Sequence, residues 1–356
     1  MIFLIIKKNV KQIKGKCIVL FYIGRNITAL LYFFVITLFN KKVVIHFKQS
    51  EPGYLILLKN IFKNKMIFIT DLEGDKIFEN DFILKSKINQ VSPQIGNEIE
   101  DEELIRKEKN KLNSYDYVFV YNEFFQNVLQ LRHNNLKCKI IVSHLMSFKK
   151  DSLFFDNYLR LKFKEKLPWN DEPVLTYIGN IYYPWQNLSK TIRLYKKIKN
   201  EINPNFKLLL LINKQDHLKA MDFIEINNLN SSDYYLAEVP NNEIVGYLNA
   251  SDIGIVLRDF HPMNKVVTSG KLLDYLGCGL PVITTSVLLN FPKNVEIIDI
   301  GLILNNLNIE KISKENIENV FKFNLTDRKN ISTWANENLS LDNLSQAYIQ
   351  TLIKIS

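Results

Sequence analysis

The residue types best suited to chemistry gather in one short segment, residues 258–274. Three cations, Arg258, Lys265 and Lys271, occur there with the carboxylate Asp274 and with small residues between them. The small residues are Thr268, Ser269 and Gly270. Cations hold phosphate oxygens, a carboxylate accepts hydrogen bonds from vicinal hydroxyls, and a glycine lets a ligand approach the backbone. This combination would suit a diphosphate joined to a ribose.

A short helix would place these side chains together. Ser269 suits the N-cap of this helix, and Gly279 suits its left-handed end. Between them, Leu272, Leu273 and Leu276 recur at the spacing of a buried stripe. The first turn of a helix attracts anions through unpaired N–H groups and its dipole, which contribute up to about 2 kcal/mol for a partly buried charge. The cations would therefore have to supply most of the charge complementarity.

Spacing alone leaves a second interpretation open. Lys271 and Asp274 are three residues apart, as in an ordinary exposed pair on a helix. Such a pair stabilises a helix by about 0.2–0.5 kcal/mol and needs no ligand. On spacing alone the structural interpretation outweighs the functional one, and the surrounding pattern has to decide between them.

Runs of β-branched residues alternate with helical patterns along both halves of the chain. In the second half the expected strands are 174–179, 207–212, 234–239, 253–257, 281–285 and 295–300. The expected helices there are 188–200, 217–227, 241–249 and 269–278. Because the strands are apolar on both faces, they suit parallel sheets covered by helices. The pattern predicts an α/β protein with two doubly wound, Rossmann-like domains facing across a cleft.

A charged and aromatic stretch, residues 148–172, interrupts this alternation and is the expected linker. We predict an N-terminal domain over residues 1–165 and a C-terminal domain over residues 166–335. The last segment, residues 336–356, has an amphipathic pattern and is expected to form a helix that crosses back to the first domain.

The motifs of the second half resemble those of a known family. The run 240–257 is followed by K-x-x-D-Y-L-x-C-G-L-P-V-I over residues 271–283, and an earlier turn reads Tyr177-Ile178-Gly179-Asn180 with Trp185 after it. Together they are similar to the C-terminal domain of the retaining glycosyltransferases of family 4, the group 1 glycosyltransferases. The resemblance extends over roughly residues 174–290. It implies the GT-B fold and transfer of a sugar from a nucleotide-diphosphate sugar, with retention and without a bound metal or other cofactor.

The resemblance implies a role for each matching position. Asp274 would bind the ribose, and Lys271 and Arg258 would bind the diphosphate and stabilise it as it leaves. The remaining donor-binding positions are Gly179, Asn180, Thr268, Ser269 and Gly270. The N-terminal domain would be the acceptor side, where Asp71 in the acidic turn 70–75 would act on the acceptor or on the sugar. The alternative for that turn is a solvated loop.

Two departures from the family pattern weaken part of this assignment. Val266 stands where many members carry the first Glu of Glu-x7-Glu, and Asn180 and Trp185 stand in the turn that usually offers Arg and then Lys. Lys190 or Lys265 could compensate for the missing cation. The aromatic residues that follow the turn, Tyr182 and Tyr183 beside Trp185, could stack on a sugar or base, or could serve packing.

The composition favours anionic partners. The formal net charge is +9, and lysines crowd residues 7–16 and residues 59–65 around Phe62. A nucleotide sugar, a saccharide or lipid-linked acceptor and an anionic membrane surface are the expected partners, and the scattered basic residues disfavour nucleic acid. A solvated surface would explain the same lysines. The three cysteines form no CxxC pair, which fits a cytoplasmic protein. Contact of the lysines with an anionic surface would place it peripherally at the inner face of the membrane.

Two other functions remain open. A nucleotide-sugar epimerase of the same fold would convert the donor without an acceptor. A non-catalytic, glycosyltransferase-like subunit would explain why Val266 and Asn180 depart from the family pattern. Product analysis with the donor alone distinguishes the epimerase, and titration with uridine and guanosine diphosphates distinguishes the non-catalytic subunit.

Overall fold

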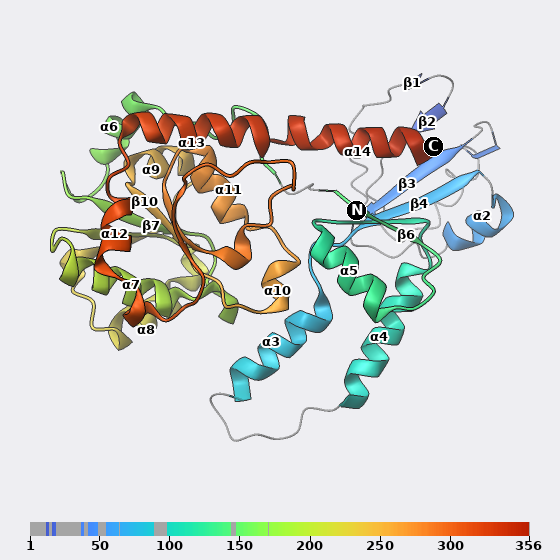
Figure 1. Cartoon of the computed structure of the whole chain (residues 1–356), viewed down its shortest axis with the longest axis horizontal. Coiled ribbons are helices and arrows are strands. Elements are labelled where there is room, and N and C mark those ends of the chain that lie inside the picture. The colour runs from blue at the N-terminus through green and yellow to red at the C-terminus, as the bar shows by residue number, and fades with distance from the viewer. Residues whose placement is uncertain are drawn as a thin grey trace. The chain divides into compact units, whose positions relative to one another are not determined.

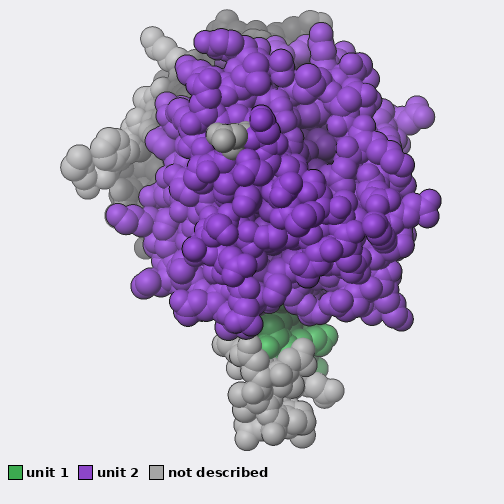
Figure 2. All heavy atoms as spheres, turned by 90° about the vertical axis from the view of Figure 1, so that its left-hand side faces the viewer, with its two compact units in different colours: residues 1–144, 345–356 green, residues 145–344 purple. Residues whose placement is uncertain are grey.

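The chain divides into two compact units in the computed structural model (Figures 1 and 2). One unit comprises Met1–His144 with Ser345–Ser356, and the other comprises Leu145–Leu344. The structure describes residues 12–13, 16–18, 37–38, 42–48, 55–63, 65–88, 98–143, 147–169 and 171–355. No helix in these ranges is long and apolar enough to cross a membrane.

The first unit is built on a sheet whose described strands lie in chain order, β1-β2-β3-β4-β5-β6. These strands are β1 (Gln12–Ile13), β2 (Lys16–Ile18), β3 (Val43–Lys48), β4 (Met66–Asp71), β5 (Tyr117–Val120) and β6 (Lys139–Val142). The first pair is antiparallel and every later pair is parallel. The helices described in this unit are α2 (Leu55–Ile61), α3 (Lys76–Ile88), α4 (Glu98–Leu112) and α5 (Glu123–Arg132).

The last helix, α14 (Leu341–Ile355), begins in the second unit and reaches the first unit from Ser345 onward. Its Leu352 is buried in a cluster with Val44, Ile69 and Phe119, which come from β3, β4 and β5. Tyr348, one turn earlier, packs edge-on against Phe119. The apolar stripe of the helix is therefore buried against the face of the first sheet.

The second unit contains a fully parallel sheet with the order β12-β11-β10-β7-β8-β9. Its strands are β7 (Val174–Ile178), β8 (Lys207–Leu211), β9 (Tyr234–Ala237), β10 (Ile253–Val256), β11 (Val282–Thr285) and β12 (Gly301–Leu304). The chain moves outward in one direction from β7 and in the other from β10. The carboxyl ends of β7 and β10 are therefore the switch point of a doubly wound sheet, where ligands bind in this class of fold.

Helices cover both faces of this sheet (Figure 1). They are α6 (Asn157–Lys164), α7 (Leu188–Glu201), α8 (His217–Ile226), α9 (Ile244–Ala250), α10 (Pro262–Lys265), α11 (Gly270–Gly277), α12 (Lys314–Val320) and α13 (Leu325–Asn338). One buried cluster joins the sheet to α6, α9, α11 and α13, and another joins it to α7, α8 and α12. Alternate residues of β7 enter the two clusters, so Leu175 and Tyr177 lie on one face and Val174 and Ile178 on the other.

The boundary between the units differs from the expected one. The second unit begins at Leu145, whereas the sequence pattern placed the change at residue 165. Phe148, Leu153 and Phe163 from the expected linker are buried in the core of the second unit. The charged residues of this stretch concealed the apolar positions of α6, and its packing against α9 makes the stretch part of the second unit.

One expected strand is also wrong. Residues 295–300 are not a strand, and the pairing with β11 begins only at Gly301. Gly301 has a φ of +122°, and a Cβ there would meet the carbonyl oxygen of Val282 at 2.3 Å. The pairing begins where a glycine allows the two backbones to approach closely, and the apolar run from residue 295 gave no sign of this position.

Candidate functional site

The sequence-predicted residues of the second half meet at the switch point between β7 and β10. Gly179 directly follows β7, and Arg258 lies two residues beyond the end of β10. The amino end of α11 reaches the same edge, because the Lys271 side chain packs against Gly179. A Cβ at Gly179 would lie 2.8 Å from Lys271 Cε, and the φ of Gly179 is +94°. Glycine is therefore needed twice at this position, for its backbone conformation and for the space that Lys271 fills.

The hydrogen-bond acceptors around the Lys271 ammonium are neutral. Its Nζ donates to Tyr177 Oη and to Gln186 Oε1, both at 2.7 Å, and lies 3.4 Å from the carbonyl oxygen of Asn180. The same nitrogen lies 4.1 Å from the centre of the Tyr177 ring, which is a favourable place for a cation. These contacts fix the position of the ammonium group without neutralising its charge.

Arg258 is buried beside the same turn. Its backbone N–H donates to Thr285 Oγ1 at 3.1 Å, and its guanidinium donates to the carbonyl oxygen of Trp185. Gln186, which contacts Lys271, is the next residue along the chain. Arg258 and Lys271 thus donate hydrogen bonds to consecutive residues, Trp185 and Gln186, of the loop after Gly179.

Lys271 and Arg258 carry their charges without an ion pair to the described residues. Burial and the neighbouring charge of Arg258 hold the pKa of Lys271 well below its usual value. Burial also lowers the pKa of Arg258. Two buried like charges destabilise the ionised state, and an anion bound between them would relieve their repulsion.

The start of α11 brings the first backbone N–H groups of this helix to the same edge. The Ser269 side chain accepts a hydrogen bond from the Leu272 N–H at 3.4 Å, which confirms the predicted N-cap. A Cβ added at Gly270 would meet no atom within 4 Å, so open space lies beside the first turn. Thr268 precedes the cap and is half-buried. The predicted helix over residues 269–278 is confirmed as α11, and Gly279 follows it with a φ of +64°.

Asp274 lies one turn further along α11 and is half-buried. Its carboxylate has no hydrogen-bond or ion-pair partner within the described parts of the chain. Burial raises the pKa of Asp274 to about 6, against the opposing effect of the Lys271 charge. A desolvated carboxylate without donors is able to accept hydrogen bonds from a ligand.

The departures from the family pattern have a structural outcome. Val266 is fully buried at the end of α10, so no side chain reaches the site from the position of the first Glu. Lys190 forms an ion pair with Asp259, and Asn187 donates to the same carboxylate at 2.9 Å. Lys190 is thus engaged in holding α7 to the segment after β10. Lys265, the other cation considered as a replacement, is exposed in α10.

The candidate acid of the first unit lies in a hydrogen-bonded chain. Asp71 ends β4, and its Oδ1 lies 2.9 Å from His46 Nε2. His46 Nδ1 in turn lies 2.6 Å from Tyr348 Oη of α14. A carboxylate only accepts, so the ring donates from Nε2 to Asp71. The hydrogen bond from His46 orients the Asp71 carboxylate.

A second carboxylate of the acidic turn 70–75, that of Asp75, serves the fold. Asp75 is fully buried, and its Oδ1 accepts from the N–H groups of Ile77 and Phe78, each at 3.0 Å. Its Oδ2 lies 2.8 Å from Arg132 Nη2. Asp75 therefore caps α3 and holds α5, which accounts for one of the turn's three carboxylates without any ligand.

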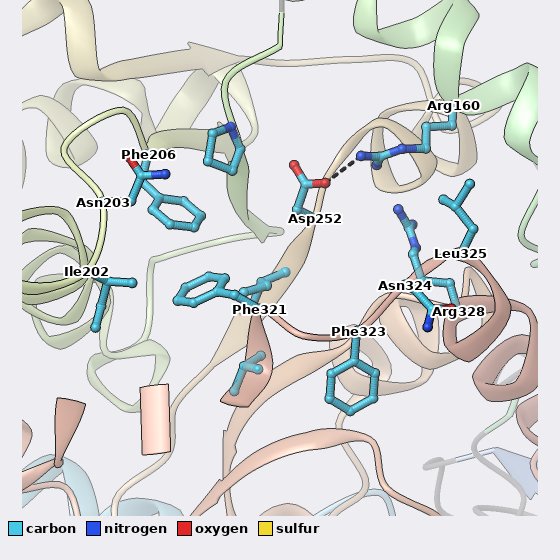
Figure 3. A pocket seen from close by; sticks show the side chains of 13 residues that line it. Arg160, Ile202, Asn203, Phe206, Asp252, Phe321, Phe323, Asn324, Leu325 and Arg328 are labelled. Atoms are coloured by element: carbon cyan, nitrogen blue, oxygen red, sulfur yellow. Dashed lines mark hydrogen bonds and ion pairs between the residues drawn. The ribbon is translucent and has the colours of Figure 1, made fainter. Parts of the chain in front are cut away.

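A separate recess of about 530 Å³ opens at the other edge of the second sheet (Figure 3). Pro173 and Ile253 line it, at the amino ends of β7 and β10, while Gly179 lies at the carboxyl end. Five residues of strand separate the two edges, roughly 17 Å at 3.3 Å per residue. The rings of Phe206, Phe321 and Phe323 surround the recess. It is not part of the candidate donor site.

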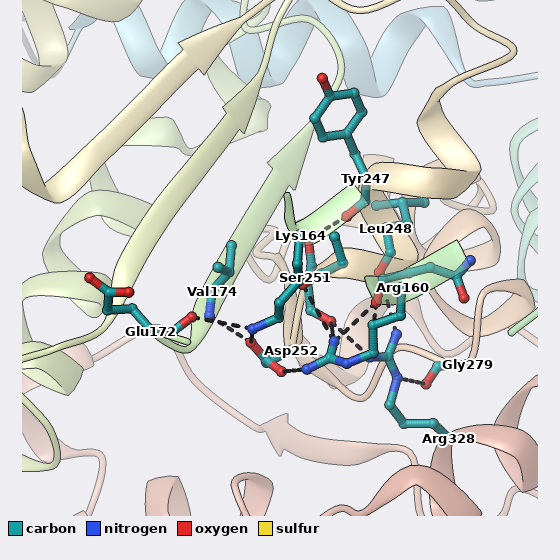
Figure 4. Close-up of polar contacts among 12 residues, drawn as sticks. Arg160, Lys164, Glu172, Val174, Tyr247, Leu248, Ser251, Asp252, Gly279 and Arg328 are labelled. Atoms are coloured by element: carbon teal, nitrogen blue, oxygen red, sulfur yellow. Dashed lines mark hydrogen bonds and ion pairs between the residues drawn. The ribbon is translucent and has the colours of Figure 1, made fainter. Parts of the chain in front are cut away.

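The charged residues of this recess stabilise the fold (Figure 4). Arg328 Nη1 donates to Ser251 O at 2.8 Å and its Nε to Gly279 O at 3.1 Å. Arg160 donates to Ser251 O at 2.8 Å and pairs with Asp252. The two guanidinium groups therefore donate to carbonyl groups at the end of α9 that the helix leaves unpaired. These hydrogen bonds join α6 and α13 to α9.

Sequence reasoning missed the groups that hold Lys271. Tyr177 and Gln186 lie 94 and 85 residues away from it along the chain. In the sequence, Tyr177 was notable only as part of the motif of the resembling family, and no local pattern marked Gln186 as a residue that contacts a cation. Among the described residues, no cluster of three or more His, Cys, Asp or Glu side chains has the arrangement to hold a metal ion.

No protein-family model matches this sequence, and no curated protein matches it. Solved structures match its fold at low sequence identity. HepE from Anabaena, in complex with UDP and glucose, has a TM-score of 0.64 at 12% identity, over 92% of this chain and 82% of that one. Sucrose-phosphate synthase from Thermosynechococcus elongatus has a TM-score of 0.63 at 13% identity, over 92% and 77%. A glycosyltransferase from Rickettsia africae has a TM-score of 0.63 at 15% identity, over 94% and 83%.

These likenesses show the fold. The chain shares with these solved structures a fold of two α/β units, the second of which is doubly wound about the switch point between β7 and β10. The expected fold class is confirmed: the chain has the GT-B fold.

Proposed function

We propose that this protein is a glycosyltransferase that moves a sugar from a nucleotide-diphosphate sugar to a saccharide or a lipid-linked saccharide. One observation carries the proposal: Lys271 and Arg258 lie at the switch point of the second sheet and form no ion pair with any described residue. Open space beside Gly270 leaves room for the anion that would neutralise them. The solved structures of the same fold include HepE in complex with UDP-glucose.

The positions of these residues suggest where each part of the donor would bind. The diphosphate would lie against Lys271, Arg258 and the N–H groups at the start of α11, where Thr268, Ser269 and Gly270 offer further donors. Asp274, one turn further along, would accept hydrogen bonds from the ribose hydroxyls. Gly179 and Asn180 would border the diphosphate from the other side, because both contact Lys271.

The same cations would accelerate the transfer. Negative charge develops on the diphosphate as its bond to the anomeric carbon breaks, and fixed positive charge in a desolvated site stabilises that state. Arg258 is buried and Lys271 half-buried, and hydrogen bonds already orient both, so no rearrangement is required. We propose that these two residues and the helix start replace a metal ion, that the anomeric configuration is retained, and that Asp71 is the acceptor-side group.

The function is tested by incubating the chain with a panel of nucleotide sugars and with saccharide acceptors, with and without a chelator. We expect one nucleotide sugar to give a glycosylated acceptor, at a rate that the chelator leaves unchanged, with the donor's anomeric configuration in the product by NMR. Conversion of the donor alone would instead identify an epimerase. Absence of binding by every nucleotide diphosphate would indicate a non-catalytic subunit.

We also propose that the first unit contacts anionic lipid through α2, which suits a lipid-linked acceptor and a peripheral position at the inner, cytoplasmic face of a membrane. Ile56, Leu57 and Ile61 of this helix are exposed, and Lys63 beside them is exposed as well. Apolar side chains next to cations are the pattern of interfacial contact. Lys59, by contrast, is paired with Asp116 at 2.9 Å. The lysines at positions 7, 8, 11 and 14 lie outside the described residues.

Vesicle binding tests this surface. The double variant Leu57→Ser with Ile61→Ser should lose most of its co-sedimentation with vesicles of phosphatidylglycerol and phosphatidylcholine, because it removes the exposed apolar side chains of α2. Leu131→Ser, which removes an exposed leucine of α5 in the same unit, is the matched control and should bind as the wild type does. Equal binding by the double variant and the control would rule out α2 as the contact.

A further inference from the structure

The loop after Gly179 displays a group of aromatic rings at the edge of the candidate site. Tyr182 is 67% exposed and Tyr183 is 42% exposed. The Tyr183 ring stacks on Trp185 with centroids 4.3 Å apart and an angle of 6° between the planes. Tyr182 meets Tyr183 edge-on at 5.0 Å. None of the three rings belongs to either core cluster of the second unit. We call residues 182–185 the aromatic loop.

The aromatic loop is held at both ends by buried residues. Ile181, just before it, is buried and donates its N–H to Asp216 Oδ2 at 3.3 Å. Gln186, just after it, is buried and accepts from Lys271 at 2.7 Å. Asn187 then turns the chain with a φ of 54° and donates to Asp259. The rings are thus presented from a fixed backbone, which lowers the entropy lost when a ligand binds.

The aromatic loop and Asp274 belong to different elements that meet at the two cations. Arg258 donates to the Trp185 carbonyl oxygen, so the loop contacts this cation directly, and Lys271 donates to Gln186, the residue after the loop. Asp274 lies three residues along α11 from Lys271, about 4.5 Å at 1.5 Å per residue. The covalent order of a nucleotide sugar is base, ribose, diphosphate and sugar. With the ribose at Asp274 and the diphosphate at the cations, the sugar would continue beyond the diphosphate, and the aromatic loop offers exposed rings beside the cations.

We propose that the aromatic loop binds the sugar of the donor, with the ring faces of Tyr182 and Tyr183 packing on the apolar C–H face of a pyranose. This inference rests on the proposed function and names the substrate part that the loop recognises. Aromatic faces offer apolar area at a small cost in side-chain entropy, and exposed aromatic groups bordered by polar residues mark ligand sites. Asn180, exposed beside the turn, and Lys219, which donates to Tyr182 O at 2.9 Å, supply the polar border.

The test compares affinities for a nucleoside diphosphate and for its sugar derivative, using UDP with UDP-glucose and GDP with GDP-mannose. In the double variant Tyr182→Ala with Tyr183→Ala, the Kd of the preferred nucleotide sugar should rise roughly 3- to 30-fold. The Kd of the nucleoside diphosphate should stay unchanged, because the cations are untouched. The double variant with Phe at both positions keeps the ring faces and should restore the wild-type affinity.

Tyr158→Ala is the matched control, since it removes another exposed tyrosine of the second unit, on α6. Thermal melting confirms that each variant is folded. An unchanged Kd for the nucleotide sugar in the alanine double variant would overturn the inference, and so would an equal loss for both ligands or a change confined to the KM of the acceptor. A wild-type chain that binds neither nucleoside diphosphate would refute the proposed function itself.

Discussion

Replacing Lys271 with methionine is expected to weaken the binding of a nucleoside diphosphate roughly 10- to 100-fold without unfolding the protein. The variant removes the charge that contacts the diphosphate and keeps an unbranched side chain to pack against Gly179 and Tyr177. Because the desolvated ammonium forms no ion pair with the described residues, its removal should leave the free energy of unfolding unchanged or higher. Calorimetric titration measures the affinity, and urea denaturation measures the stability.

Lys314→Met is the control for this change. Lys314 is an exposed cation of α12 in the same unit, paired with Glu318, and its loss changes the net charge equally. It should leave nucleotide affinity within the error of the titration. Comparable losses in the two variants would show that overall charge, and not the position of Lys271, governs binding.

Lys271 also predicts a proton coupled to binding. Its pKa is held well below the usual value by burial and by Arg258, and a bound diphosphate would raise it again. At a pH above the pKa of Lys271 in the free protein, binding should therefore take up a proton. The affinity should fall as pH rises above that pKa. Titrations in buffers of different ionisation enthalpy detect the uptake, which Lys271→Met should abolish.

Replacing Asp274 with asparagine is expected to have opposite effects on stability and on binding. Burial raises the pKa of Asp274 from 3.8 to about 6 in the folded chain. In the folded state Asp274 therefore stays protonated to a higher pH than in the unfolded state. The free energy of unfolding decreases as pH rises from the pKa of the unfolded state through that of the folded state. Asparagine avoids this loss, so above pH 6 the variant should gain about 1–3 kcal/mol in the free energy of unfolding.

The same variant should bind nucleotide roughly 10- to 100-fold more weakly at neutral pH, because an amide accepts more weakly than a carboxylate. In the wild type, affinity should decrease as pH falls below about 6. This dependence should disappear in Asp274→Asn. A stabilised variant that still binds as the wild type does would remove Asp274 from the ribose site and leave it as a structural acid.

The sequence was sufficient for the parts of this account that depend on local pattern. The order of apolar runs predicted the second sheet, and Ser269, the leucines and Gly279 predicted α11 close to its observed ends. Each signal lies within a few residues of the feature that it predicts. Lys271 and Asp274 were recognisable for the same reason, because both lie in that helix.

The environment of the site could not be predicted in this way. The partners of Lys271, Tyr177 and Gln186, come from a different strand and turn, and no local pattern connects them to it. Asp71 is similar, since His46 comes from the neighbouring strand and Tyr348 lies 302 residues from His46. Contacts of this kind depend on the sheet order, which the alternation of elements leaves open.

The division into domains was misjudged for a related reason. Residues 148–172 look like a linker because charged residues dominate them, yet Arg160 is engaged with the carbonyl groups at the end of α9 and with Asp252. A charged side chain that satisfies buried carbonyl groups is part of a core, although its residue type suggests a surface.

A crystal structure of the chain with its preferred nucleoside diphosphate tests the central claim most directly. The account predicts diphosphate oxygens within hydrogen-bonding distance of Lys271 Nζ and of the backbone N–H groups at the start of α11, with the ribose hydroxyls on the Asp274 carboxylate. A nucleotide bound elsewhere, with Lys271 still bonded only to Tyr177 and Gln186, would contradict it.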